Sequence, residues 1–184
     1  THLAIDGIIA QVIKLPDIIR SLAGNGIRIY VGVNVDDLHE RAGSKDVLHL
    51  HGELMKIRSV KDEDYIEELS VDDIETTPER RGKNGHPMRP HIVFFNEAVP
   101  NITPAMQLAA EADVFVVIGT SLAVYPAASL VGWVKNNDVP IYVVDPSTPK
   151  IPFLRNRIFH KKERAAIGLP KLVAQLKEFA HIKS

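Results

Sequence analysis

The chain has 184 residues, 45% hydrophobic and 24% charged, so it can bury a sizeable core and is too apolar to be disordered. Its 22 Lys and Arg nearly balance its 23 Asp and Glu, which argues against nucleic acid or a membrane surface as a partner. The absence of cysteine excludes disulfides, thiolate zinc sites and cysteine nucleophiles, and fits a reducing, cytoplasmic compartment. We expect no membrane helix and no signal peptide, because the long apolar run and the basic leader that they need are missing.

The first elements predicted are a short helix and a buried strand. Pro16 and Asp17 begin the helix, and Gly24-Asn25-Gly26 end it. Residues 27–33 are rich in β-branched side chains, which is typical of a strand inside a parallel sheet. The sequence therefore opens a strand-and-helix pattern.

Polar side chains follow this strand: Asn34, Asp36, Asp37 and His39. Residues 36–41 predict a helical turn, and residues 47–50 predict a second, short strand that ends in His51. Polar groups just past the carboxyl ends of buried strands are where open α/β sheets bind ligands. A histidine at such a place can serve in acid–base chemistry near neutral pH.

Residues 53–89 are charged, punctuated by Pro and Gly, and poor in core-forming side chains. We interpret them as a small inserted module that is not part of the main sheet, with residues 1–52 and 90–184 forming one Rossmann-like domain. Two roles for the module stay open, a solvated decoration and a wall of a binding cleft.

Strands and helices alternate through the rest of the chain. The predicted strands are residues 91–95, 114–118, 141–144 and 157–160, and the predicted helices are residues 103–112, 126–136 and 169–179. Thr103-Pro104 is expected to form the cap and first turn of its helix. This alternation predicts an α/β fold with a doubly wound parallel sheet.

Two further strand ends carry candidate ligand groups. The apolar strand 114–118 runs into Gly119-Thr120-Ser121, where a glycine allows close backbone approach and hydroxyls can bond ribose or phosphate oxygens. The strand 141–144 ends in Asp145, whose carboxylate could hold a ribose diol. Taken alone, the Gly-Thr-Ser triplet is more often a simple turn than a nucleotide site, and Asp145 is as typical of a capping or turn aspartate as of a ribose contact.

The histidines call for a comparison of alternatives. His51 is a candidate base, although a lone histidine is more often a packed or surface group. His39, His49 and His51 together could suggest a metal site, but their spacing does not match the ligand patterns of helical metal sites. We therefore predict no metal.

Four segments occur together in this order: NVDDLHERAGS, HLHGEL, RPHIVFFNEAVP and GTSLAVYPAASL. In this combination the chain resembles the sirtuins, the NAD-dependent protein-lysine deacylases, from about Leu22 to its C-terminus. The cysteine-free run of residues 55–88 stands where many sirtuins carry a four-cysteine zinc ribbon, so the chain looks most like the zinc-free, often bacterial, members.

The resemblance implies a reaction in which an acyl-lysine oxygen attacks C1′ of NAD, nicotinamide leaves, and O-acetyl-ADP-ribose is formed. It implies that His51 is the catalytic base and that Asn34 and Asp36 contact an ordered water and the nicotinamide carboxamide. Further cofactor contacts are implied for Val35, Gly119, Thr120, Ser121, Asp145 and Ala166. Contacts to the acyl-lysine protein or peptide are implied for Phe95, Asn96, Glu97 and Val124.

The sequence also departs from the family pattern. The GAGxS loop that wraps the pyrophosphate is absent from the 184 residues, and Gly32-Val33 replace Thr-Gln. Asn96 replaces a glycine and is expected to place a side chain where the substrate backbone approaches. These departures keep open an alternative, a truncated or degenerate sirtuin-like domain that binds peptide or nucleotide without turnover. A generic nucleotide-binding α/β protein is a more distant alternative.

Overall fold

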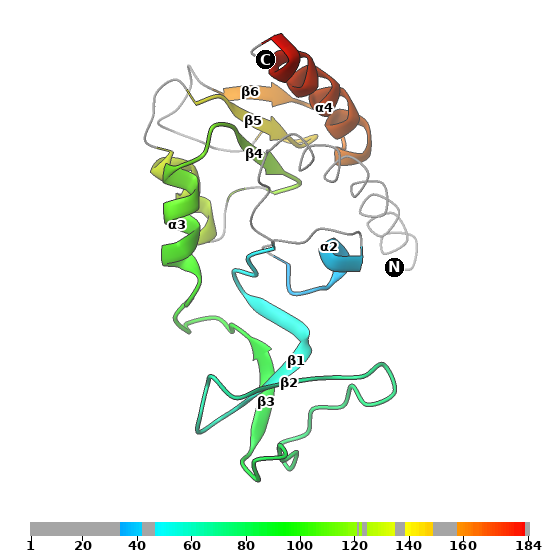
Figure 1. Ribbon diagram of the computed structural model, residues 1–184, viewed down its shortest axis with the longest axis vertical. Coiled ribbons are helices and arrows are strands. Elements are labelled where there is room, and N and C mark those ends of the chain that lie inside the picture. The colour runs from blue at the N-terminus through cyan, green and yellow to red at the C-terminus, as the bar shows by residue number, and fades with distance from the viewer. Residues whose placement is uncertain are drawn as a thin grey trace.

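The computed structural model describes residues 34–41, 47–120, 122, 125–134, 139–148 and 158–182. It contains two sheets of three strands each, one parallel and one antiparallel, with the helix α2 (Leu38–Arg41) between them in the view of Figure 1. The helix expected from Pro16 and the strand expected over residues 27–33 lie outside the described residues.

The parallel sheet consists of β4 (Phe115–Ile118), β5 (Ile141–Val144) and β6 (Ile158–Lys161), in the order β4-β5-β6. Val117 of β4 lies opposite Val143 of β5, and β5 is parallel to β6 in turn. The three strands agree with the predicted ones to within one residue at each end. They confirm the predicted α/β fold.

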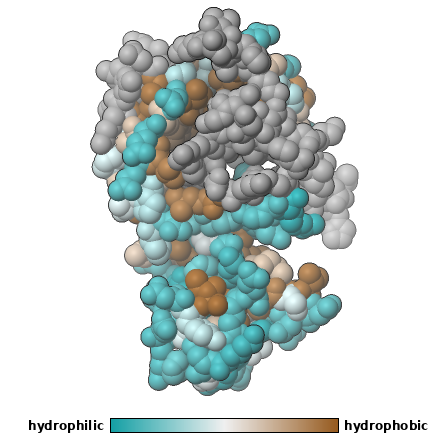
Figure 2. Space-filling view, viewed as in Figure 1, coloured by the Kyte–Doolittle hydropathy of each residue, from teal (hydrophilic) through white to brown (hydrophobic). Residues whose placement is uncertain are grey.

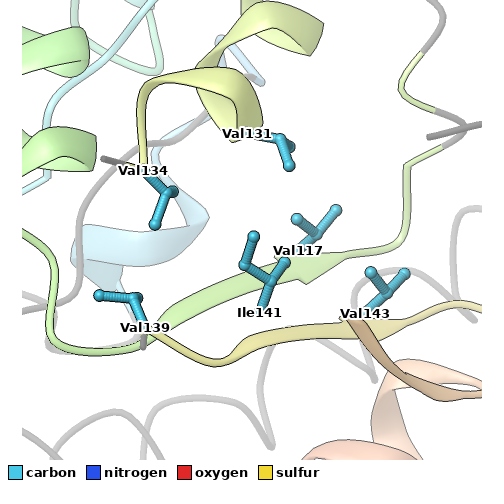
Figure 3. Close-up of a cluster of buried hydrophobic side chains, with 6 residues drawn as sticks. All are labelled: Val117, Val131, Val134, Val139, Ile141 and Val143. Atoms are coloured by element: carbon cyan, nitrogen blue, oxygen red, sulfur yellow. The ribbon is translucent and has the colours of Figure 1, made fainter. Parts of the chain in front are cut away.

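Hydrophobic side chains cover both faces of this sheet. On one face, residues of β4 and β5 pack against the helix η1 (Ala127–Trp133) and the residues that flank these elements. Figure 3 shows this cluster, which is formed by Val117, Val131, Val134, Val139, Ile141 and Val143. On the other face, Val144 packs against α4 (Ala165–Ile182) through Leu169, Leu172, Val173 and Leu176. Alternate residues of β5 thus point to opposite faces, as a sheet with helices on both sides requires.

The helices differ in detail from the predicted ones. α3 (Ile102–Ala110) begins after Asn101, not at a Thr103-Pro104 cap. The helix predicted over residues 126–136 is a 3-10 helix over Ala127–Trp133, and the backbone N–H of Ser129 donates to the carbonyl of Pro126 with the i→i+3 spacing of that helix type. α4 begins four residues earlier than predicted, so Pro170 lies inside the helix, close to its start. There the proline removes one backbone hydrogen bond, and the 18-residue helix keeps the others.

The second sheet is antiparallel and has the order β2-β1-β3, formed by β1 (Gly52–Ser59), β2 (Ile66–Glu68) and β3 (Met88–Ile92). Most of the charged segment 53–89 belongs to it. Figure 2 shows this lower part of the molecule covered mainly by hydrophilic residues, with a small hydrophobic patch.

Two short strands were predicted wrongly. Residues 47–50 contain only one bridge residue, His49, and the regular strand starts later, at Gly52. The apolar character of this segment reflects the complete burial of Leu50 against residues of α3 and η1. The strand predicted over residues 91–95 instead spans Met88–Ile92, because the Glu97 carboxylate accepts the backbone N–H of Phe94 and turns the chain there.

Candidate active site

The carboxyl edge of the parallel sheet brings together the ends of β4 and β5. Gly119 follows β4, Asp145 follows β5, and the Gly119 N–H donates to the carbonyl of Val144 at 3.0 Å. Because neighbouring parallel strands end at the same edge, both turns face the region where α/β sheets bind ligands.

The turn after β4 has the backbone shape of a binding loop. Gly119 adopts φ 59°, and a Cβ placed on it would meet no heavy atom of the described residues within 4 Å, so these residues leave the space beside it open. The hydroxyl oxygen of Thr120 accepts the N–H of Leu122 at 3.1 Å, which keeps the turn tight. Ser121 and Val124, also predicted for the site, lie outside the described residues.

Asp145 is buried and shapes the turn after β5. Its Oδ1 accepts the backbone N–H of Ser147 at 2.7 Å and also the Ser147 hydroxyl. Its carbonyl oxygen lies 2.9 Å from Nε2 of His160 on β6. The side chain is therefore a turn-forming carboxylate, and a contact with a ribose diol stays a prediction.

The loop 34–37 is held at both ends. The Asp36 carboxylate accepts the N–H of Leu38 at 3.2 Å, two residues along the chain, and so closes an Asx-type turn that leads into α2. The carbonyl of Val35 accepts the N–H of Leu54 in β1 at 2.7 Å. The exposed Asn34 thus stands on a loop that is attached directly to the strand following His51.

His51 directly precedes β1 of the antiparallel sheet and directly follows Leu50, which packs on the part of the chain that holds the parallel sheet. The preceding residue, Leu50, is completely buried against Ala105 of α3 and Leu130 of η1. The carbonyl of His51 accepts the N–H of Val93 at 2.9 Å, and β1 begins at the next residue. The residue before His51 is therefore buried in a hydrophobic cluster with α3 and η1, and the residue after it begins the antiparallel sheet.

The turn 94–97 presents its two central side chains outward. Phe95 is 91% exposed, and Asn96 has φ 69°. A glycine at position 96 would suit this left-handed backbone, and asparagine tolerates it better than most other residues. The position that the resemblance assigns to glycine therefore has a conformational requirement, in addition to the close approach that we expected.

Glu97 holds this turn in place. Its carboxylate receives two hydrogen bonds from the Arg89 guanidinium, at 2.8 and 3.0 Å, and lies 3.8 Å from the guanidinium of the buried Arg58. The hydrogen bonds from Arg89, followed by the one from the N–H of Phe94, lower the pKa of Glu97 below its ordinary value of 4.5. The carboxylate is thus engaged within the protein and fixes the turn.

Ala166 lies in the first turn of α4, close to the end of β5. Two residues further on, a Cβ on Gly168 would come 2.6 Å from a methyl group of Val144, so the start of α4 packs tightly on this strand. The tight packing places Ala166 near the carboxyl edge of the sheet.

Sequence reasoning missed the polar contacts that surround His49. His49 Nε2 lies 2.8 Å from a carboxylate oxygen of Glu40, and its carbonyl accepts the side-chain N–H of Asn101 at 2.7 Å. The HLH pattern and the carboxylate of Glu40 were visible in the sequence, but nothing local joins them. In the described part of the chain, no group of three or more His, Asp or Glu side chains could hold a metal ion, and no helix is long and apolar enough to cross a membrane.

The fold and this edge define a Rossmann-like α/β protein with an inserted antiparallel module. The model of the Sir2 family matches residues 10–126. An NAD-dependent protein deacylase of Aggregatibacter actinomycetemcomitans is 55% identical over 118 residues, which are 62% of this chain and 53% of that protein. The chain belongs to the Sir2 family.

Solved structures agree with this assignment. A mutant of a Sir2 homologue in complex with ADP-ribose has a TM-score of 0.76 and 32% identity, covering 92% of this chain and 68% of that one. Sir2 with a p53 peptide and NAD+ has a TM-score of 0.68 and 27% identity, covering 95% and 70%. The chain spans about half the length of the curated deacylase from Aggregatibacter actinomycetemcomitans.

Proposed function

We propose that the protein is an NAD-dependent protein-lysine deacylase that releases nicotinamide and O-acetyl-ADP-ribose, with His51 as its general base. The observation that carries the proposal is the position of His51 at the junction of the two sheets, beside a loop tied to the same strand through Val35. The membership of the chain in the Sir2 family and the name of its relative, NAD-dependent protein deacylase, support it.

The carboxyl edge of the sheet fits a dinucleotide. The open space beside Gly119, which lacks a Cβ, leaves room for the close approach of a ligand. We assign Gly119, Thr120, Ser121, Asp145 and Ala166 to the adenosine side, and Asn34, Val35 and Asp36 to the nicotinamide side. Bound NAD would supply a ribosyl carbon with nicotinamide as its leaving group.

His51 would act on a ribose hydroxyl. A neutral imidazole accepts a proton from a hydroxyl near neutral pH, which makes the oxygen a better nucleophile. The buried Leu50 on one side and the start of β1 on the other limit how far the ring can move. A base held in this way loses little freedom when the substrate binds.

The acyl-lysine peptide would bind along the turn 94–97. The 91% exposed Phe95 offers an apolar surface, and Asn96 and Val124 would flank the peptide, with Glu97 holding the turn. An extended peptide can add its backbone to exposed strand edges, and β3 ends just before this turn. The neighbouring structure of Sir2 with a p53 peptide supports this assignment.

We also propose that residues 53–89 form a zinc-free module inserted into a Rossmann-like domain of residues 1–52 and 90–184, in a cytoplasmic protein. The chain has no cysteine. The Ser59 hydroxyl accepts the N–H groups of Lys61 and Asp62 at 3.2 and 3.3 Å and so closes a turn. The Arg80 guanidinium makes two hydrogen bonds to Asp73, at 2.8 and 2.7 Å. These contacts can order the module without a metal.

The test is nicotinamide release by the full protein from NAD and an acetyl-lysine peptide. We expect His51→Ala to lower the rate at least about 100-fold, since a general base contributes a factor of this size. His86→Ala is the matched control, because His86 lies in a turn of the antiparallel module, and we expect no change in rate. If the wild-type protein binds peptide or NAD but releases no nicotinamide, the alternative of a binding domain without turnover replaces this proposal.

A further inference from the structure

His49 is a buried polar residue next to the proposed base. Its side chain is only 8% exposed, and its Nε2 lies 2.8 Å from Oε1 of Glu40 and 3.9 Å from Oε1 of Glu53. Glu53 is also bound to the Lys56 ammonium at 2.9 Å. The close partner of the ring is therefore Glu40, which is 41% exposed at the rim of the contact.

The contact between His49 and Glu40 joins two segments that both lie beside residues of the proposed site. Glu40 belongs to α2, the helix that directly follows the loop 34–37, and His49 precedes His51 by two residues. The carbonyl of His49 also accepts the side-chain N–H of Asn101, which anchors it at the start of α3. The pair thus connects the nicotinamide side of the proposed site, through α2, to the segment that carries the base.

A second connection runs along the other side of His51. The carbonyl of Val35 accepts the N–H of Leu54, three residues beyond His51. The chain around His51 is therefore attached to the 34–41 segment twice, before the residue by the His49–Glu40 contact and after it by the Val35–Leu54 hydrogen bond. Two attachments that flank a residue fix both its distance and its orientation relative to the loop, which one attachment cannot do.

Packing alone does not explain a histidine at this place. Nδ1 of His49 is buried and has no hydrogen-bond partner among the described residues. An unpaired buried nitrogen destabilises a fold, and an apolar side chain of similar volume would avoid this cost. The contact of the other ring nitrogen, Nε2, with the Glu40 carboxylate therefore accounts for a histidine at this position.

We propose that His49 and Glu40 form a positioning pair that holds His51 in register with the loop 34–37. The inference rests on the proposed function, because it assigns the pair to the reaction in which His51 is the base. A base displaced by a fraction of an ångström from its hydroxyl transfers the proton more slowly, while substrate binding remains almost unchanged.

The experiment compares His49→Leu, His49→Gln and Glu40→Gln in the full protein. In steady-state nicotinamide release, we expect His49→Leu to lower kcat about tenfold and to change KM for NAD and peptide less than about twofold. His49→Gln keeps a donor that can reach Glu40 and should restore most of the loss. Glu40→Gln changes a residue at the surface, so it tests the pair without endangering the fold.

Arg41→Ala is the control on the same helix. Arg41 is exposed, and its ion pair with Asp37 spans 3.9 Å, so its removal should leave kcat unchanged. The double variant His49→Leu/Glu40→Gln should be no slower than His49→Leu alone, because His49→Leu already removes the hydrogen bond that Glu40→Gln weakens by removing the charge.

A second readout does not depend on turnover. Hydrogen exchange of the Leu54 amide, which reports the other attachment, should become faster in His49→Leu and stay unchanged in Arg41→Ala. The inference is overturned if His49→Leu keeps the wild-type kcat, or if both His49 variants lose activity equally with KM rising in parallel. If the wild-type protein releases no nicotinamide, the proposed function fails, and an unchanged Leu54 exchange rate would then overturn the pair as well.

Discussion

Gly52, the residue after His51, has a backbone conformation that other residues avoid. Its φ is +85°, and a Cβ at this position would lie 2.1 Å from the carbonyl oxygen of His91 on the neighbouring strand. A methyl group here therefore meets both backbone strain and a collision with main-chain atoms that cannot rotate away. The close approach of β1 to β3 at this point fixes where the chain leaves His51.

We expect Gly52→Ala to lower the free energy of unfolding by about 2 kcal/mol or more and to reduce activity, since the strands must separate beside His51, the proposed base. Gly85→Ala separates the two causes. Gly85 has a similar φ of +77°, but a Cβ added there would meet no heavy atom of the described residues within 4 Å. It should cost only the strain, about 1 kcal/mol. Urea unfolding of both variants checks this, and equal losses would contradict the role of the collision.

Residues directly after a strand could be located from the sequence, because a strand pattern also fixes which residue ends the strand. Gly119 and Asp145 were placed at the sheet edge in this way. The contact of His49 with Glu40 could not be found, because it spans nine residues and depends on how α2 folds back. The engagement of Glu97 by Arg89 likewise depends on the pairing of β3 with β1.

The long helix α4 is held by one face. Leu172 is 1% exposed and packs in the cluster around Val144, whereas Ile167 on the same helix is 53% exposed. We expect Leu172→Ala to lower the free energy of unfolding by about 2–5 kcal/mol, through lost burial and the cavity that remains. Ile167→Ala should change it by less than about 0.5 kcal/mol. Thermal or chemical unfolding decides, and similar losses in both variants would disprove the docking of α4 through this face.

The elements that the sequence predicted best are strands whose side chains are apolar on both faces of the sheet. The strands β4 and β5 consist entirely of apolar and aromatic residues, mostly β-branched, so their composition marks them almost to the residue. The segment 47–50 gave the same signal although it contains only one bridge residue, His49, because Leu50 is buried in a cluster with residues of α3 and η1. Hydrophobic runs of four residues report burial, and they do not distinguish a strand from a buried loop.

The antiparallel module can be tested for metal dependence. Its loops are closed by Arg80, whose guanidinium bonds the Asp73 carboxylate twice and the carbonyl of Glu75 at 2.6 Å. Since the proposed module holds no zinc, an excess of EDTA should leave the thermal transition of the protein unchanged. Arg80→Ala should instead increase proteolysis within residues 70–81. A fall of the melting temperature on chelation would refute the zinc-free assignment.

The two sheets are connected by segments that carry residues of the proposed site. The segment around His51 enters from the core through Leu50 and continues as β1, and the return path runs from β3 through the turn 94–97 to α3 (Figure 1). A rotation of one sheet against the other would therefore move the exposed Phe95 and His51 relative to the edge that carries Gly119. The attachments through Glu40 and Val35 act against such a rotation.

Charges near this junction make the stability of the molecule depend on pH. Burial, followed by the positive charges of Arg58 and Lys56 and opposed by Glu53, lowers the pKa of His91 below its ordinary value of 6.5. Nδ1 of His91 is buried and has no hydrogen-bond partner among the described residues, so a proton there gains no acceptor. Between its folded pKa and 6.5, the unfolded chain binds more protons than the folded one, and stability falls as the pH falls.

The carboxylates act in a lower range. Arg89 lowers the pKa of Glu97 from 4.5, and Arg80 lowers that of Asp73 from 3.8, so their ion pairs stabilise the fold fully above these values. That stability is lost as the pH falls through the lower folded pKa of each group. We expect the melting temperature to fall in two steps on acidification, the first below pH 6.5 and the second below about pH 4.5.

His91→Gln separates the first step from the second. Glutamine does not titrate, so the variant should lose much of the decrease between pH 6.5 and 5 and keep the decrease at lower pH. His86→Gln is the matched control, because it removes a histidine from a turn of the same module, and it should follow the wild-type curve. Melting curves at half-unit pH intervals provide the measurement. If His91→Gln follows the wild-type curve throughout, burial of His91 does not set the first step.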